Sequence, residues 1–207
     1  MVEHREYFNR RLHSLLGVVP IGIFVVQHLI INHFVVYGEE SFNKAANFMA
    51  NLPFVTALEI FVIYLPILFH AILGVYIALW VPSYNNKSYG YFRNWMYTLQ
   101  RISGIITLIF IAWHVYQTKV QIALGNVELN YDLMANILNQ PFFFWFYIIS
   151  IIAVVFHLAN GLWSFCVHWG IAQSPRSQQI VTYATVIVFF VVSYIGIRSI
   201  IQFSVGA

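Results

Sequence analysis

Four histidines lie well inside long apolar stretches of the sequence, one in each of the first four stretches. An ionisable side chain at membrane depth is costly, and it is therefore usually kept for a function. A single histidine in such a place often donates a hydrogen bond between helices, but four on successive stretches favour a shared role in binding a cofactor. The four are His28, His70, His114 and His157.

The composition explains why these stretches must be membrane spans. The chain has 207 residues, of which 60% are hydrophobic and only 8% are charged, whereas a soluble domain carries about 25% charged residues. A soluble fold of this composition would expose large apolar patches, so we expect an integral membrane protein in contact with lipid. The formal charge of +3 is spread without long basic runs, which excludes the usual kind of nucleic-acid binder.

Five stretches are long enough to cross a hydrocarbon core of about 30 Å, which takes roughly 20 apolar residues in a helix. Segments rich in Gly, Pro, Asn and Glu separate them, and none of these segments is long enough for a second domain. We therefore predict an all-α fold with a single five-helix transmembrane domain over residues 1–207. The expected spans are about 12–36, 54–80, 95–119, 142–169 and 179–203.

The distribution of Lys and Arg predicts the orientation. Seven of these residues lie on the side of the N-terminus, against three on the opposite side. Because basic loops stay in the cytoplasm, we expect a cytoplasmic N-terminus and an outward-facing C-terminus. Basic, polar surface on the inner side falls in the N-terminal segment, in residues 87–93 and at Arg176, and we expect soluble partners to bind there.

With this orientation the four histidines fall at two levels. His70 and His157 each lie about 25 Å along an inward-running helix, in the inner half of the membrane. His28 and His114 lie past the middle of outward-running helices, in the outer half. Two neutral imidazoles at one level are what a haem with two axial histidines requires. The spacing therefore predicts a di-haem bundle formed by the first four helices, with two b-type haems.

An internal repeat supports this pairing. In the first unit, His28 and His70 are 42 residues apart. In the second unit, His114 and His157 are 43 residues apart. In both units the second histidine is followed four residues later by glycine.

Two further glycines, Gly17 and Gly104, lie 11 and 10 residues before the first histidine of each unit. That spacing is about 15–16 Å in a helix, which puts both glycines near the level of the inner pair. A missing side chain there lets a flat ring approach the backbone, so we expect both to contact a cofactor. Close helix packing through small residues is the alternative.

Other polar residues could serve the two water-facing sides. His13 and His168 lie near the inner boundary, together with the basic Arg10, Arg11 and Arg101. Haem propionates need such partners, although interfacial snorkelling explains the same residues. On the outer side three residues could bind a quinone carbonyl or relay protons, although each could also cap a helix end: Asn32, His33 and Glu59.

Other cofactor chemistry lacks its motif. A single cysteine, Cys166, excludes an intramolecular disulfide framework and the C-x-x-C-H attachment of a c-type haem. The sequence has no G-x-x-x-x-G-K-[ST] and no H-E-x-x-H, and no cytoplasmic segment is large enough to hold a flavin.

Short motifs surround each candidate ligand in order. They are Arg11-Leu-His-Ser-Leu-Leu-Gly17, Gln27-His28, Phe69-His70-Ala-Ile-Leu-Gly-Val-Tyr76, Gln100-Arg-Ile-Ser-Gly-Ile-Ile-Thr107, Trp113-His114, and His157-x-x-Asn-Gly-Leu-Trp163 followed by Trp169-Gly170. In these motifs the chain resembles the cytochrome b membrane anchors of Bacillus-type succinate:menaquinone oxidoreductases, and the similarity covers essentially the whole sequence.

The resemblance implies a two-haem anchor in the bacterial cytoplasmic membrane without a succinate site of its own. Such an anchor docks a flavoprotein and an iron–sulfur subunit on its cytoplasmic face and passes electrons across the membrane to menaquinone. By residue match, His70 and His157 would hold the haem nearer the iron–sulfur subunit, and His28 and His114 the distal one. Positions that match contacts of the proximal haem's propionates are His13, Ser14, Tyr97 and His168.

Two other functions stay open at this point. The chain could be the cytochrome b subunit of another respiratory quinone enzyme, which the co-purifying subunits would distinguish. It could also be a haem-free transporter or membrane scaffold with structural histidines, whose reduced absorption spectrum would lack an α-band.

Overall fold

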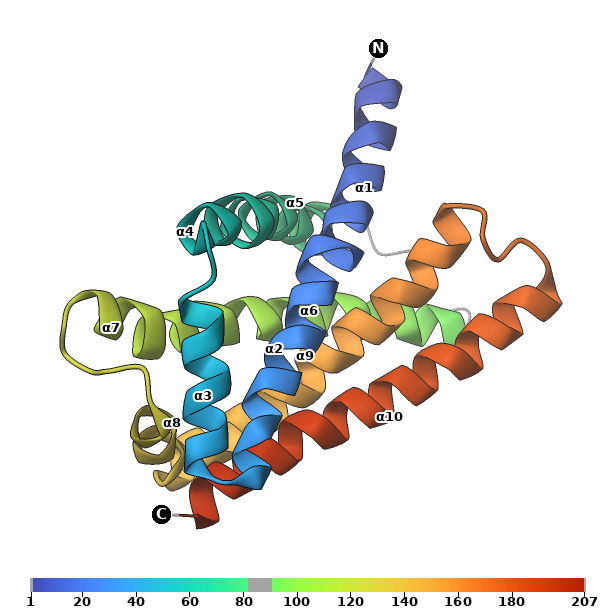
Figure 1. The fold of residues 1–207 in the computed structure, drawn as a ribbon. Coiled ribbons are helices and arrows are strands. Elements are labelled where there is room, and N and C mark those ends of the chain that lie inside the picture. Colours follow the sequence, from blue (N-terminus) through green and yellow to red (C-terminus); the bar gives the residue numbers. More distant parts are fainter. Residues whose placement is uncertain (1, 82–90, 207) are drawn as a thin grey trace.

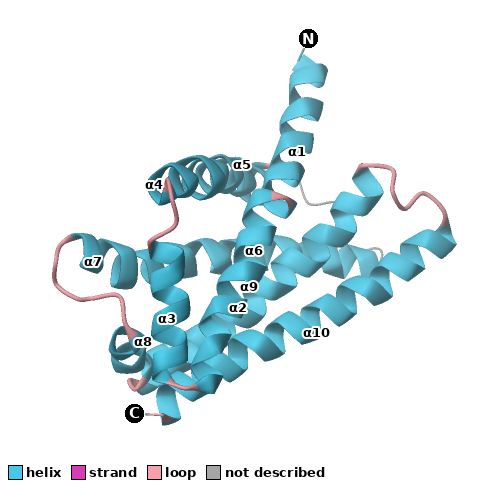
Figure 2. Cartoon of the chain, in the orientation of Figure 1, coloured by secondary structure: helices cyan, strands magenta, loops and turns pink. Residues whose placement is uncertain are grey.

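A computed structural model describes residues 2–81 and 91–206, with side chains from Arg5 onward. Within these residues every regular element is helical and none is a strand (Figure 2). The predicted all-α membrane fold with five spans is confirmed. The helical stretches that are long and apolar enough to cross a membrane are Arg5–Tyr37, Val55–Trp80, Phe92–Ala123, Pro141–His168 and Pro175–Val205.

The first span consists of α1 (Val2–Val18), α2 (Pro20–His33) and the short 3-10 helix η1 (Phe34–Tyr37). Pro20 separates α1 from α2 because its ring nitrogen cannot donate to the preceding turn, yet proline is well tolerated in the first turn of a new helix. The N-terminal part of α1 extends past the rest of the chain (Figure 1).

The second and third spans each contain a π-helical segment. The second consists of α4 (Val55–Leu58), η2 (Glu59–Tyr64) and α5 (Leu65–Trp80), and the third of α6 (Phe92–Val115), η3 (Tyr116–Val120) and α7 (Gln121–Ala123). Both η2 and η3 are π-helical, a form that is rare and often found at functional sites. An ion pair between Lys119 and Glu59 joins the two segments.

The fourth and fifth spans, α9 (Pro141–His168) and α10 (Pro175–Val205), pack side by side (Figure 1). The inward face of α10 carries small residues, among them the buried Gly196 and Ser199, while Phe190 and Tyr194 are exposed on its outer face. Small residues let two helix backbones approach closely in a membrane. The exposed aromatic face of α10 is suited to lipid.

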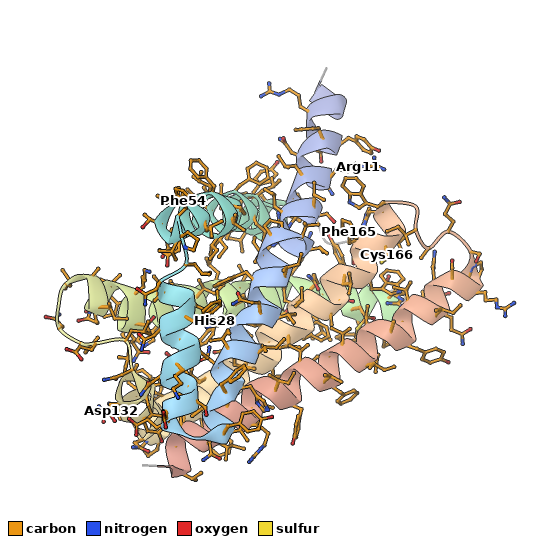
Figure 3. All side chains as sticks on the ribbon, in the orientation of Figure 1. Arg11, His28, Phe54, Asp132, Phe165 and Cys166 are labelled. Atoms are coloured by element: carbon orange, nitrogen blue, oxygen red, sulfur yellow. The ribbon has the colours of Figure 1, made fainter. Side chains whose placement is uncertain are left out.

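Two short helices cover one end of the bundle, α3 (Glu39–Ala50) and α8 (Tyr131–Leu138). Much of the buried core lies here, where Phe203 at the end of α10 packs against Phe42 and Tyr131 with ring centroids 4.9 and 5.4 Å apart. We call this the acidic end, after Glu39, Glu40, Glu59 and Asp132. The opposite, basic end carries Arg11, Arg93, Arg101 and Arg176. Figure 3 shows Arg11 and Asp132 at the two ends and His28 between them.

The first prediction concerns this core. Phe203 is only 1% exposed, so Phe203→Ala should leave a cavity between α10, α3 and α8 and cost roughly 3–5 kcal/mol of stability. The expected result is a clear drop in thermal unfolding temperature in detergent. Tyr194→Ala, on the exposed face of the same helix, should change it little. An equal effect of the two substitutions would contradict the assignment of the core.

Candidate cofactor-binding site

The four intramembrane histidines come together in two pairs. His70 on α5 and His157 on α9 have ring centroids 6.2 Å apart with ring planes at 90°. His28 on α2 and His114 on α6 have ring centroids 6.0 Å apart with ring planes at 74°. Each pair joins one helix from each half of the internal repeat, as the sequence predicts.

The two rings of the first pair are held in the same way. Nδ1 of His70 lies 2.9 Å from the carbonyl oxygen of His13 on α1, and Nδ1 of His157 lies 3.1 Å from the carbonyl oxygen of Gln100 on α6. In both cases the partner is 57 residues earlier in the chain. A carbonyl oxygen only accepts hydrogen bonds, so Nδ1 carries the proton. The lone pair of each ring is therefore on Nε2.

In the second pair, side chains rather than main-chain carbonyls favour a proton on Nδ1 and a lone pair on Nε2. The hydroxyl of Tyr147 donates to Oε1 of Gln117 over 3.2 Å and lies 3.1 Å from Nδ1 of His114. Its one proton is used on Gln117, so His114 must donate from Nδ1. The amide nitrogen of Asn32 lies 3.3 Å from Nε2 of His28, and because an amide NH2 only donates, this Nε2 also holds a lone pair. These contacts favour Nε2 as the acceptor nitrogen of each neutral ring, and in His28 this atom lies beside the Asn32 amide.

Gly17 and Gly104 lie where the sequence argument places them, against the rings of the first pair. A Cβ atom at Gly17 would stand 2.8 Å from Nδ1 of His70, and one at Gly104 would stand 2.9 Å from Cε1 of His157. Both distances are shorter than a non-bonded contact allows. Glycine at these positions lets each imidazole lie directly on the neighbouring helix, within reach of the carbonyl that fixes its proton.

The basic end holds polar atoms without a protein partner. The ring of His13 stacks on His70 with centroids 3.9 Å apart. Within the part of the chain that the structure describes, three nitrogens near this end are buried without a hydrogen-bond partner: His13 Nδ1, Arg101 Nε and Trp169 Nε1. A buried polar group without a partner is costly, and these groups are suited to an anionic ligand.

Two of the other residues expected at this end, Tyr97 and His168, have partners in the chain. Tyr97 accepts a hydrogen bond of 2.5 Å from the guanidinium of Arg101. His168 is exposed, and its Nδ1 lies 2.8 Å from the carbonyl of Ser164. Ser14 is half-buried on α1 beside His13. The structure therefore places Tyr97 and Arg101 together, and the contacts of these residues with a cofactor stay predictions.

The paired histidines fit a haem. A haem supplies four ligands itself and needs only two from the protein. With a metal–nitrogen bond of about 2 Å, two imidazoles on one metal have ring centroids about 6 Å apart, close to the 6.2 and 6.0 Å observed. Among the described residues no group of three or more His, Cys, Asp or Glu converges, so pairs of imidazoles are the metal-binding chemistry that this part of the chain offers.

Each of the three residues expected to contact quinone has one polar group bonded within the chain. Asn32 donates to the carbonyl of its own helix at His28 over 2.8 Å. The ring of His33 lies 3.1 Å from the carbonyl of Ile195 on α10. Glu59 is paired with Lys119. A quinone-binding role for Asn32, His33 and Glu59 stays a prediction.

Two surface hollows lie at the acidic end. One, of about 730 Å³, runs along α3 and has charged walls that include Glu39, Glu40 and Lys44. The hydrogen bond from Lys44 lowers the pKa of the Glu40 carboxyl below its ordinary value. The other, of about 350 Å³, lies between η3 and α8 and has no charged side chain in its lining, which includes Gln117.

Sequence reasoning missed two groups of positioning residues. One is the pair Tyr147 and Gln117, which orients His114. The other is Asn160, whose amide donates to Gln100 Oε1 over 2.7 Å and thereby locks the residue that holds His157. Tyr147 lies ten residues before His157 on the same predicted helix. This position was a usable signal, since a phenol inside the membrane also needs a hydrogen-bond partner.

The sequence is similar to known membrane subunits. A family model described as succinate dehydrogenase/fumarate reductase transmembrane subunit matches residues 86–197. The succinate dehydrogenase cytochrome b558 subunit of Bacillus subtilis (strain 168) is 53% identical over 203 residues, which cover 98% of this chain and 100% of that protein.

The second prediction tests the two glycines separately. Gly17→Ala should push the ring of His70 away from α1, weaken its bond to the His13 carbonyl and cost about 1–3 kcal/mol through overpacking. Nitrogen-15 NMR of histidine-labelled protein reports each Nδ1. We expect the His70 signal to move and the His157 signal to stay. Gly104→Ala should do the reverse, so each variant controls for the other. Unchanged signals in both would contradict the packing of these rings on glycine.

Proposed function

Since the chain belongs to the succinate dehydrogenase/fumarate reductase transmembrane subunit family, we propose that it is the di-haem cytochrome b anchor of a succinate dehydrogenase. It carries electrons from an iron–sulfur subunit across the membrane to menaquinone and has no succinate site of its own. The observation that carries this proposal is the presence of two histidine pairs at haem-ligand spacing, with a hydrogen-bond partner at Nδ1 of three of the four rings.

In this proposal His70 and His157 hold one haem, and His28 and His114 hold the other. A haem with two imidazole ligands supplies one-electron transfer and offers no open iron position to a substrate. The chain contributes the orientation of the ligands. Each bond at Nδ1 fixes the ring and its tautomer, and such partners also make an imidazole a stronger ligand.

The two pairs lie at different depths, which suits transfer across the membrane. His157 packs on Gly104 of α6, and His114 is ten residues further along the same helix, which is about 15 Å. A protein with chemistry at the basic end alone would have little use for the second pair. We therefore place menaquinone reduction at the acidic end, on the outer side of the membrane in the orientation that the basic residues predict.

The unpartnered nitrogens at the basic end are suited to the carboxylates of a haem. Arg101 Nε and His13 Nδ1 lie beside the first pair, where propionates would form charge-assisted hydrogen bonds. Tyr97 lies within the same contact through Arg101. Ser14 and His168 are assigned to this group by the resemblance of their positions.

The basic end is also the proposed docking surface for the iron–sulfur subunit, which in turn binds the flavoprotein. There α1 extends past the bundle (Figure 1) and exposes Tyr7 and Phe8, which are 57% and 64% exposed, beside the exposed Arg5. Arg176 is exposed on the same side. Aromatic side chains and arginine are enriched at protein interfaces. Lys87 lies outside the residues that the structure describes.

The third prediction tests haem ligation and the direction of transfer. His70→Leu should remove one of two low-spin haems, because a single imidazole leaves one axial position empty, and His28→Leu should remove the other. Haem content per subunit and the low-spin electron paramagnetic resonance signals are the measurements. His33→Ala, a histidine outside both pairs, should retain two haems. Two intact low-spin haems in both leucine variants would contradict the ligand assignment.

Activity adds the direction of transfer. In an assembled His28→Leu complex, succinate should still reduce a soluble dye at the flavoprotein, whereas menaquinone reduction should fall steeply. Full menaquinone reduction without the second haem would contradict the placement of the quinone at the acidic end.

The fourth prediction tests the docking surface. Combined Arg5→Glu and Arg176→Glu should weaken retention of the soluble subunits on washed membranes roughly two- to tenfold, and more at low salt, because exposed charge pairs contribute little individually and are screened. Arg93 is a poorer probe because its guanidinium lies 3.6 Å from the ring centroid of Trp163. Lys44→Glu at the acidic end is the matched control. Equal retention in the double variant and the control would contradict this surface.

A further inference from the structure

A hydrogen-bond chain connects the second histidine pair to the surface of the protein. It runs from Nδ1 of His114 to the hydroxyl of Tyr147 over 3.1 Å and from that hydroxyl to Oε1 of Gln117 over 3.2 Å. Gln117 lies on the π-helical segment η3 and lines the hollow of about 350 Å³ between η3 and α8. Tyr147 is only 2% exposed, so the chain links a buried ring to an open surface through one buried residue.

The lining of this hollow combines neutral amides with apolar side chains. The amides are Gln117, Gln121, Asn136 and Gln140, and the apolar wall includes Leu133 and Ile137. The volume is at the lower end of the range for small-molecule sites, about 300–1,000 Å³. Such a lining is suited to a flat, uncharged ring with carbonyl oxygens, whereas the hollow along α3 has charged walls.

The orientation of two of these amides is fixed by bonds within the chain. Oε1 of Gln117 accepts from Tyr147, and Oε1 of Gln121 accepts from Asn126 over 2.8 Å. Each amide therefore has its NH2 group left to donate. A quinone has two carbonyl oxygens that accept hydrogen bonds and has no donor. By contrast, Nδ1 of His33 is bonded to α10 and the carboxylate of Glu59 is paired with Lys119.

We propose that the hollow between η3 and α8 binds the quinone ring, with the NH2 of Gln117 donating to one carbonyl oxygen and Tyr147 acting as a positioning residue for His114. This inference rests on the proposed function, because it assigns a place to the menaquinone named there. Reduction of the quinone converts both C=O groups to C–OH. The two electrons come from succinate oxidation in the partner subunits, and the two protons come from water at the acidic end.

Tyr147 also affects the second pair directly. The hydroxyl oxygen of Tyr147 accepts a hydrogen bond from Nδ1 of His114. This bond raises the electron density on the ring and favours oxidised iron. Tyr147→Phe removes this acceptor and retains the shape of the ring. The reduction potential of one of the two haems should rise, and that of the other should stay unchanged. A purely structural role for Tyr147 would not produce this selective shift.

The experiment uses the complete complex in detergent with menadione as the quinone. Gln117→Leu should raise the KM for menadione roughly three- to tenfold through loss of one hydrogen bond, with succinate-to-dye activity at the flavoprotein unchanged. Gln121→Leu, one turn further along the same wall, is the second variant in case Gln117→Leu assembles poorly. Asn47→Leu replaces an exposed amide in the charged hollow along α3 and should leave the KM as in the wild type.

The outcomes separate this inference from the function it rests on. A wild-type complex without haem or without quinone reduction contradicts the proposed function. A wild-type complex that reduces menadione, with unchanged KM in both glutamine variants, overturns the hollow alone. A raised KM in Asn32→Leu together with unchanged KM in Gln117→Leu also overturns it, because the quinone then lies beside His28. An unshifted haem potential in Tyr147→Phe overturns the positioning role.

Discussion

The structure depends on placing one proton on each of four imidazoles inside a membrane. A neutral imidazole has one donor and one acceptor nitrogen, and neither can be left to water in the bilayer. For three rings the partner at Nδ1 accepts a hydrogen bond from the ring. For His28, the amide of Asn32 donates to Nε2, which makes this nitrogen the acceptor. Because a neutral imidazole carries one ring proton, the nitrogen without that proton holds the lone pair. The ligand geometry follows from the hydrogen bonds behind the rings as much as from the histidines themselves.

This constraint explains why the packing is uneven along the bundle. At the acidic end, aromatic and aliphatic side chains from α3, α8 and α10 form a dense core around Phe203. Of the second span, Val55–Trp80, only Pro66 is buried although this span carries His70. Around the first pair, helices meet through an imidazole lying on a glycine. Side chains large enough to form a conventional core would occupy the positions that the rings and a flat cofactor require.

The sequence predicted the features that depend on position along one helix. The five spans, the pairing of the histidines and the level of Gly17 and Gly104 follow from counting residues at a fixed rise. Features that depend on neighbours from distant segments were not accessible in this way. Tyr147 is 33 residues from His114 and Gln117 is 30 residues from Tyr147, and no periodicity connects them. The π-helical turns at η2 and η3 lie inside spans that are apolar overall, so mean hydropathy could not reveal them. The sequence predicts His33 and Glu59 on the outer side, but their bonds to α10 and η3 become visible only when the helices are packed.

The two histidine pairs differ in a way that matches the different tasks proposed for them. The first pair donates to main-chain carbonyls of α1 and α6, which no substitution at those positions removes and no ligand can displace. This arrangement suits a site that only has to pass electrons. In the second pair, His114 donates to a side chain whose own partner lies at an open, amide-lined surface. A bond network that ends at the surface can respond to what binds there, because polarisation passes along connected hydrogen bonds. The end at which we propose that the quinone binds is thus the end at which side chains surround the histidine pair.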